Sequence, residues 1–175
     1  TMASIGFVFS AVLALIFIDV EKYHAFIIVG LIFGMIGDIL LDLKRLYKQD
    51  AGVYLNYGML VFGLGHIMYF MALGNFYGFT GSFVAKTFLS LAIGAVASVG
   101  VVFLGGKLMK LNFGEFKWQS FAYSTVLIAV MALSLMFGGF TGELQLMNIG
   151  LIVFFLLDLV LSTQYFGNRE DIKLL

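Results

Sequence analysis

The sequence predicts an all-α fold, a polytopic transmembrane helical bundle with about six spans. Of its 175 residues, 62% are hydrophobic and only 11% are charged, well outside the range of soluble domains. The apolar residues lie in runs of about 20, the length that an α-helix needs to cross a bilayer. The basic residues gather in alternate connections between these runs, as they do in helical membrane proteins.

Each expected span is a continuous apolar run bounded by polar residues or glycines. The first run has no basic segment before it and no small-residue cleavage site after it, so it does not resemble a signal peptide. The six runs cover residues 3–18, 24–43, 54–73, 83–104, 118–137 and 146–166. No soluble domain or linker interrupts them, and they predict a single transmembrane domain, 1–175.

Charge predicts the orientation of the bundle. With six spans, the N-terminus, the 44–53 loop, the 105–117 loop and the C-terminal tail share one side of the membrane. That side carries eight of the ten basic residues: Lys44, Arg45, Lys48, Lys107, Lys110, Lys117, Arg169 and Lys173. The other side keeps only Lys22 and Lys86. The positive-inside rule therefore predicts that both termini of this chain are cytoplasmic.

Composition also excludes several functions. The chain has no cysteine, and therefore no disulfide, thiol nucleophile or thiolate metal site. Its formal net charge is zero, which argues against nucleic acid as a partner. The two histidines, His24 and His66, are too few for a histidine-rich metal cluster. We therefore predict no metal and no cofactor, and the sequence indicates no particular oligomeric state.

The stretch Gly30–Asp42 carries the first polar pattern inside a span. Gly30, Gly34, Asp38 and Asp42 step by four and so share one helix face. The glycines predict close packing of this face against another helix. A carboxylate within a span is costly and usually faces the bundle interior or a water-filled cavity, so we expect Asp38 to point inward. Asp42 lies near the cytoplasmic end and is either solvated or a substrate contact.

Two other spans carry polar faces. In the third, His66 and Tyr69 lie on one face near mid-membrane, where a lone histidine would otherwise be read as a packing residue. In the fifth, Tyr123 and Met131 belong to a stripe at helical spacing, although a tyrosine near a helix end is commonly an interfacial anchor. The stripe comprises Ser120, Tyr123, Leu127, Met131 and Ser134.

The sixth span holds the second deep carboxylate, Asp158, which steps by four with Gly150, Phe154 and Ser162. Asp158 is about eight residues, or about 12 Å, from the cytoplasmic end of its run, and Asp38 is about five residues, or about 8 Å, from the same side. Both acids are therefore expected in the cytoplasmic half. If their helices are neighbours, the two acids and His66 fall within reach of one shared cavity.

The order of these motifs resembles that of the YhhN-type lysoplasmalogenases. The matching segments are Gly-Asp-Ile-Leu-Leu at 37–41, Gly-Met-Leu-Val-Phe-Gly-Leu-Gly-His-Ile-Met-Tyr at 58–69, Tyr123 with Met131, and Gly-Leu-Ile-Val-Phe-Phe-Leu-Leu-Asp at 150–158. Leu157 departs from the family, which often has serine before the last aspartate. A Lys-Pro pair usually precedes the first helix and another helix usually follows the last. The chain is therefore expected to be trimmed at both ends of a protein with about eight spans.

The resemblance implies an integral membrane hydrolase, expected in a bacterial cell (inner) membrane among membrane lipids. Its substrate would be a lysophospholipid, the lysoplasmalogen, whose vinyl ether bond is cleaved to a fatty aldehyde and a glycerophospho-alcohol. The family's acids and histidine fall on three residues expected to be catalytic: Asp38, His66 and Asp158. The residues expected to contact the substrate are Tyr69, Tyr123, Asp42, Met131 and Ser162.

This chemistry suits two buried carboxyl groups. A carboxyl kept protonated in an apolar pocket would protonate the vinyl ether carbon, while an ionised partner would stabilise the cation and activate water. The sequence does not assign the two roles between Asp38 and Asp158. Two other functions stay open: a lipid or solute carrier whose acids relay protons, and a metal-dependent lipid amidase like the alkaline ceramidases. The carrier lacks visible repeats, and the amidase lacks a three-histidine site.

Overall fold

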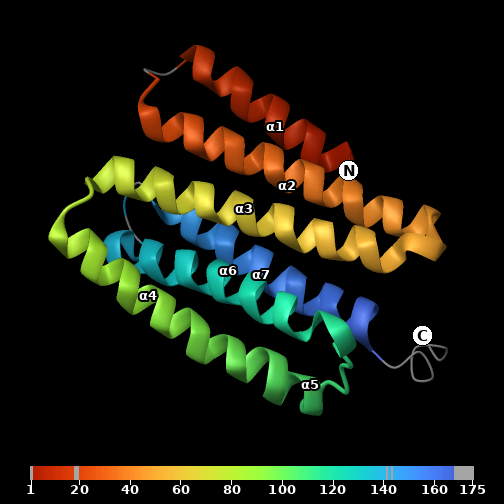
Figure 1. Ribbon diagram of the computed structural model, residues 1–175. Coiled ribbons are helices and arrows are strands. Elements are labelled where there is room, and N and C mark those ends of the chain that lie inside the picture. Colours follow the sequence, from red (N-terminus) through yellow and green to blue (C-terminus); the bar gives the residue numbers. More distant parts are fainter. Residues whose placement is uncertain (1, 18–19, 141, 143, 168–175) are drawn as a thin grey trace. The chain divides into compact units, whose positions relative to one another are not determined.

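The computed structural model describes residues 2–17, 20–140, 142 and 144–167. Its long elements are all helices (Figure 1). Contacts divide the chain into two compact units, Thr1–Val84 and Ala85–Leu175. The all-α class predicted from the apolar runs is confirmed.

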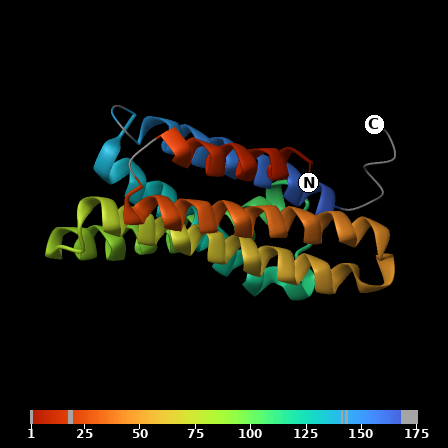
Figure 2. The same cartoon turned by 90° about the horizontal axis from the view of Figure 1, so that it is seen from above.

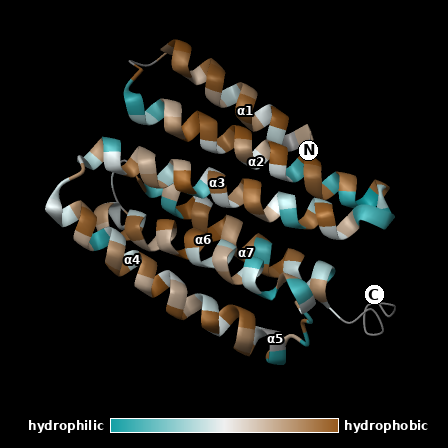
Figure 3. Cartoon of the chain, in the orientation of Figure 1, coloured by the Kyte–Doolittle hydropathy of each residue, from teal (hydrophilic) through white to brown (hydrophobic). Residues whose placement is uncertain are grey.

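Five helical segments are long and apolar enough to cross a membrane, and they match five of the six predicted spans within a few residues. They are Lys22–Leu46, Lys48–Tyr77, Gly81–Leu104, Gly114–Gly138 and Gln145–Phe166. The run predicted at 3–18 gives a shorter apolar helix, Ser4–Phe17. Figure 3 shows hydrophobic residues along the helices and hydrophilic ones around the α2–α3 turn.

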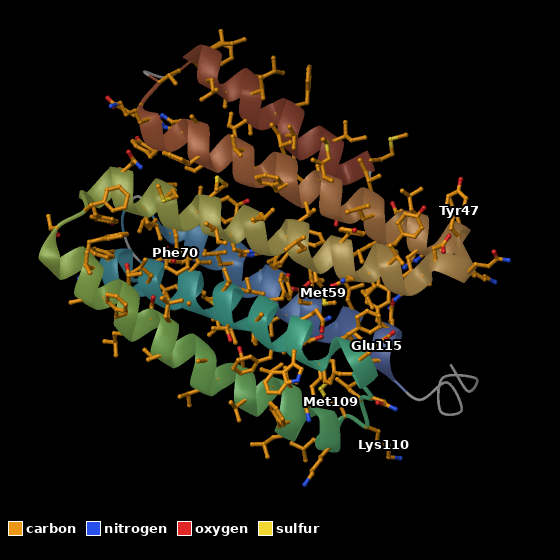
Figure 4. All side chains as sticks on the ribbon, viewed as in Figure 1. Tyr47, Met59, Phe70, Met109, Lys110 and Glu115 are labelled. Carbon is orange, nitrogen blue, oxygen red and sulfur yellow. The ribbon has the colours of Figure 1, made fainter. Side chains whose placement is uncertain are left out.

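The first unit consists of α1 (Met2–Ala14), α2 (Lys22–Leu46) and α3 (Ala51–Tyr77). A 3₁₀ turn, Lys48–Asp50, joins α2 to α3, and the two helices pack along their length as an antiparallel pair (Figures 1 and 2). α1 lies beside α2. The side chain of Tyr47 lies at the α2–α3 turn (Figure 4), with its ring centroid 5.9 Å from that of Tyr54.

Local sequence explains where α2 begins and α3 ends. Glu21 and His24 form a capping box at the start of α2, in which the Glu21 backbone N–H donates to His24 Nδ1 at 2.9 Å. Such a cap satisfies amide groups that have no partner within the first turn. Gly78 ends α3 with φ of 79°, a left-handed value that glycine adopts without steric cost. These devices lie at the same end of the α2–α3 pair.

Glycines bring α2 and α3 together, but not quite those that the sequence predicted. A Cβ at Gly30 would lie 2.5 Å from the ring of Tyr69, so the predicted close packing of Gly30 is confirmed. A Cβ at Gly34 would meet nothing within 4 Å. The second contact is made by Gly37, whose Cβ would lie 2.6 Å from the ring of Phe62. Successive contacts are therefore seven residues, or two helical turns, apart. This spacing is expected when the angle between the two helix axes is small.

Gly37→Ala and Gly34→Ala are expected to have opposite effects on stability. The added methyl at Gly37 must displace the buried Phe62 ring, which we expect to cost about 1–3 kcal/mol. At Gly34 the methyl meets open space, and removing a mid-helix glycine is expected to stabilise by up to about 1 kcal/mol. Thermal unfolding of both variants in detergent measures the difference. Equal midpoints would contradict the packing described.

The second unit holds most of α4 and all that follows. α4 (Gly81–Val99) continues into a π-helical turn, Gly100–Leu104, and the short α5 (Gly105–Leu108). After a 3₁₀ turn, Gly114–Phe116, come the two remaining long helices, α6 (Lys117–Gly138) and α7 (Gln145–Phe166). Gly139, with φ of 53°, ends α6. The backbone N–H of Asn112 donates to the carbonyl of Phe166 at 2.7 Å, which ties the α5–α6 connection to the end of α7.

The α4–α6 contact is close because Gly94 has no side chain. A Cβ there would lie 2.5 Å from the carbonyl oxygen of Thr125 and 3.1 Å from the Cβ of Ala129. Toward the other end of α6, Lys86 Nζ donates to the carbonyl of Met136 at 3.3 Å and lies 3.9 Å from the centre of the Phe137 ring. The lysine thus satisfies a carbonyl in the last turn of α6, where a cation is favourable.

Candidate functional site

Asp38 belongs to the first unit and is partly buried. It lies eight residues before Leu46, the last residue of α2, or about 12 Å along the axis. The hydroxyl of Ser4 in α1 donates a hydrogen bond to Asp38 Oδ2. The carboxyl is therefore directed toward α1, and its partner is a neutral hydroxyl from the neighbouring helix.

The contacts between α2 and α3 place Asp38 relative to His66. Gly30 opposite Tyr69 and Gly37 opposite Phe62 set the register of the two helices. A helix turns about 100° per residue, so Asp38 and His66 both project from the same flank of the α2–α3 pair. Along the axis, His66 is level with residue 33 and so about 8 Å from the level of Asp38.

His66 is buried, with only 4% of its surface exposed. Its Nδ1 lies 2.7 Å from the carbonyl oxygen of Phe62, one turn earlier in α3. A carbonyl only accepts hydrogen bonds, so Nδ1 carries the hydrogen, and in the neutral ring Nε2 carries the lone pair. The ring of Tyr69 meets the imidazole edge to face at a centroid distance of 5.8 Å. The predicted pairing of His66 with Tyr69 on one face of the helix is thus present.

Asp158 belongs to the second unit and is also partly buried. It too lies eight residues before the end of its helix, Phe166, or about 12 Å along the axis of α7. The phenol of Tyr123 in α6 donates a hydrogen bond to Asp158 Oδ2. Tyr123, which the sequence suggested as a substrate contact, is therefore a partner of the second acid.

The remaining predicted residues occupy varied surroundings. Asp42 is exposed, one turn beyond Asp38. Met131 is half-buried on α6, eight residues after Tyr123. The hydroxyl of Ser162 donates to the carbonyl of Leu159 in its own helix at 2.7 Å. The roles of these three residues as substrate contacts stay predictions.

The predicted residues therefore form two groups. Asp38, His66 and Tyr69 lie on the α2–α3 pair, whereas Tyr123 and Asp158 join α6 to α7. The meeting of the two acids in one shared cavity stays a prediction. Within the described residues, no group of three or more histidines, aspartates or glutamates is placed to hold a metal ion.

Sequence reasoning missed Ser4. The apolar stretch at residues 2–17 has two hydroxyl side chains, Ser4 and Ser10, and both were available as signals. Six residues apart, they point in different directions on a helix, and only the packing of α1 on α2 distinguishes them. Ser4 meets Asp38, whereas Ser10 is exposed.

Comparison with known proteins gives one match. The family model described as the YhhN family matches residues 2–174, essentially the whole chain. No curated protein and no solved structure matches the chain significantly. The match includes the helices that carry Asp38, His66 and Asp158. Because the match extends over nearly every residue, the chain belongs to the YhhN family.

Proposed function

We propose that this protein is a membrane hydrolase that cleaves the vinyl ether bond of lysoplasmalogens to a fatty aldehyde and a glycerophospho-alcohol. The observation that carries the proposal is the pair of carboxyl groups, Asp38 and Asp158, each within a long apolar helix and each bonded to a hydroxyl of the adjacent helix. Membership of the YhhN family supports it, since the motifs that resemble lysoplasmalogenases contain both acids.

Connectivity adds a second support. If the five long helices all cross the membrane, α2 and α7 run in the same direction, because three crossings, an odd number, lie between them. Each acid lies eight residues before the last residue of its helix, or about 12 Å along that helix's own axis. Matching positions along two helices of the same direction support a reaction that uses both acids.

The reaction needs an acid and a base in turn. One carboxyl gives its proton to the β-carbon of the vinyl ether, which leaves an oxocarbenium ion at the carbon that bears the oxygen. The other, ionised, stabilises this cation and takes a proton from the water that adds to it. The resulting hemiacetal collapses: its hydroxyl loses a proton, the carbon–oxygen bond to glycerol breaks, and the glycerol oxygen takes up a proton. The products are the aldehyde and the glycerophospho-alcohol.

Other residues assist in this proposal. His66, whose Nδ1 lies 2.7 Å from the Phe62 carbonyl oxygen, orients the attacking water. Tyr69 faces the substrate's polar oxygens. Tyr123 orients Asp158 through its hydroxyl. Each of these groups is a neutral hydrogen-bonding side chain, which limits the number of charges that the apolar surroundings must hold.

We also propose the orientation that basic residues favour. Lys44 and Arg45 close the last turn of α2, and Lys48 follows in the turn before α3. The positive-inside rule places this turn in the cytoplasm, and with it the end of α2 that is nearer to Asp38. A bacterial inner membrane is the corresponding location. Cysteine accessibility at Lys48 and at Thr80, on the opposite turn, measures this orientation in intact cells.

Purified protein in proteoliposomes is expected to release aldehyde from lysoplasmenyl-choline or lysoplasmenyl-ethanolamine. The saturated-ether analogue is the matched control, because it has no double bond to protonate and should give no product. Addition of a chelator should leave the rate unchanged, and loss of activity with the chelator would favour the metal-dependent amidase class instead. No aldehyde from either substrate, together with proton-coupled uptake into the vesicles, would replace the hydrolase proposal by a carrier.

A further inference from the structure

α1 contributes one polar contact to the proposed site. The helix is mostly exposed along its apolar side chains, with Phe7 71% and Phe9 63% exposed. Ser4, by contrast, is half-buried and donates its hydroxyl hydrogen to Asp38 Oδ2. The bond joins residues that are 34 positions apart in the sequence. A polar contact of this kind is specific in direction, unlike the apolar contacts beside it.

The position of Asp38 on α2 explains why the partner comes from α1. Gly30 and Gly37 mark the line along which α2 meets α3. At 100° per residue, Asp38 projects about a quarter-turn away from that line. The α3 side chains on the α2–α3 contact line therefore do not point toward the carboxyl group of Asp38. The helix beside that group is α1.

We propose that Ser4 is a positioning residue that orients the carboxyl group of Asp38. A hydrogen bond to Oδ2 hinders rotation of the carboxyl group about its bond to Cβ, and it leaves Oδ1 as the oxygen that faces the substrate. This role rests on the proposed hydrolase function. Through Ser4, α1 takes part in the reaction, although this helix lies outside the motifs that contain the two acids.

Ser4→Ala is expected to lower kcat for aldehyde release about 10- to 30-fold and to leave KM nearly unchanged, because the lost bond orients a reacting group and does not bind substrate. Ser4→Thr keeps a hydroxyl and should restore most of kcat. Valine has the shape of threonine without its hydroxyl, so Ser4→Val should behave like Ser4→Ala. If Ser4→Ala does not fold, the comparison of Ser4→Val with Ser4→Thr provides the same test. Ser10→Ala, an exposed serine on the same helix, is the matched control and should match the unaltered protein.

A second measurement does not depend on activity. Dicyclohexylcarbodiimide, a lipid-soluble reagent for carboxyl groups, labels Asp38, and mass spectrometry of the peptide follows the rate. Ser4→Ala and Ser4→Val should label about tenfold faster, because Oδ2 is no longer engaged with the serine hydroxyl, whereas Ser4→Thr and Ser10→Ala should not.

The two measurements separate the failures. If the unaltered protein releases no aldehyde, the hydrolase proposal fails, and labelling alone decides whether Ser4 controls the carboxyl group. Unchanged labelling of Asp38 in Ser4→Ala and Ser4→Val overturns the positioning role. So does a rise in kcat on loss of the hydroxyl, or a valine variant as active as the threonine variant.

Discussion

Asp38→Asn and Asp158→Asn are each expected to reduce aldehyde release at least about 100-fold, since proton transfer by a positioned group commonly contributes a factor of 100 to 10,000. An amide neither gives up a proton as a carboxylic acid does nor stabilises a cation as a carboxylate does. It does keep the shape of the side chain and a carbonyl oxygen that accepts from Ser4 or Tyr123. Both variants should therefore remain folded, and steady-state aldehyde release from proteoliposomes is the measurement.

Asp50→Asn is the matched control for these variants. Asp50 is exposed in the 3₁₀ turn between α2 and α3, and its neutralisation should leave the rate within about twofold of the unaltered protein. Size-exclusion profiles in detergent should be the same for all three variants. Full activity in either Asp38→Asn or Asp158→Asn would remove that residue from the mechanism.

Gly94→Ala is expected to be the most destabilising single methyl addition in the second unit. The new Cβ would lie 2.5 Å from the carbonyl oxygen of Thr125, and a backbone atom within a helix cannot rotate aside as a side chain can. α4 and α6 must therefore separate, at a cost of about 2–3 kcal/mol. For a protein of this size, that corresponds to a fall in the thermal unfolding midpoint of about 5–10 °C.

Gly150→Ala on α7 provides the comparison, because a Cβ there meets nothing within 4 Å. Its unfolding midpoint should be equal to or above that of the unaltered protein, since alanine favours the helix. A Gly94→Ala variant as stable as Gly150→Ala would mean that α4 and α6 are not in contact at Gly94.

The long spans could be predicted from the sequence because hydropathy is a local property. A run of about 20 apolar residues must form a helix in lipid, where every backbone amide and carbonyl needs a partner within the segment. Five such segments appear where the apolar runs predicted them. Within the described residues, the stretch predicted at 3–18 is also helical and apolar, at Ser4–Phe17.

Helix contacts were harder to predict than helices. Steps of four place Gly30, Gly34 and Asp38 near one face, and the sequence predicted that the glycines pack closely against another helix and that Asp38 points into the bundle. In the structure the glycines at 30 and 37 meet α3, while Asp38 turns to α1. Side chains that project 80–100° apart on a helix can contact different neighbouring helices. The number of helices that pack around a given helix cannot be predicted from its own sequence.

By itself, the sequence determined that this protein is a helical membrane protein, and it picked out Asp38, His66 and Asp158 as unusual polar residues within apolar segments. It did so because composition and the cost of a charge in lipid depend only on the residues present along each segment. Only the tertiary structure decided that Ser4 rather than Ser10 meets Asp38, that Tyr123 meets Asp158, and that Gly37 rather than Gly34 receives a neighbouring ring. Those choices depend on how one helix is rotated against another, which packing between distant segments determines.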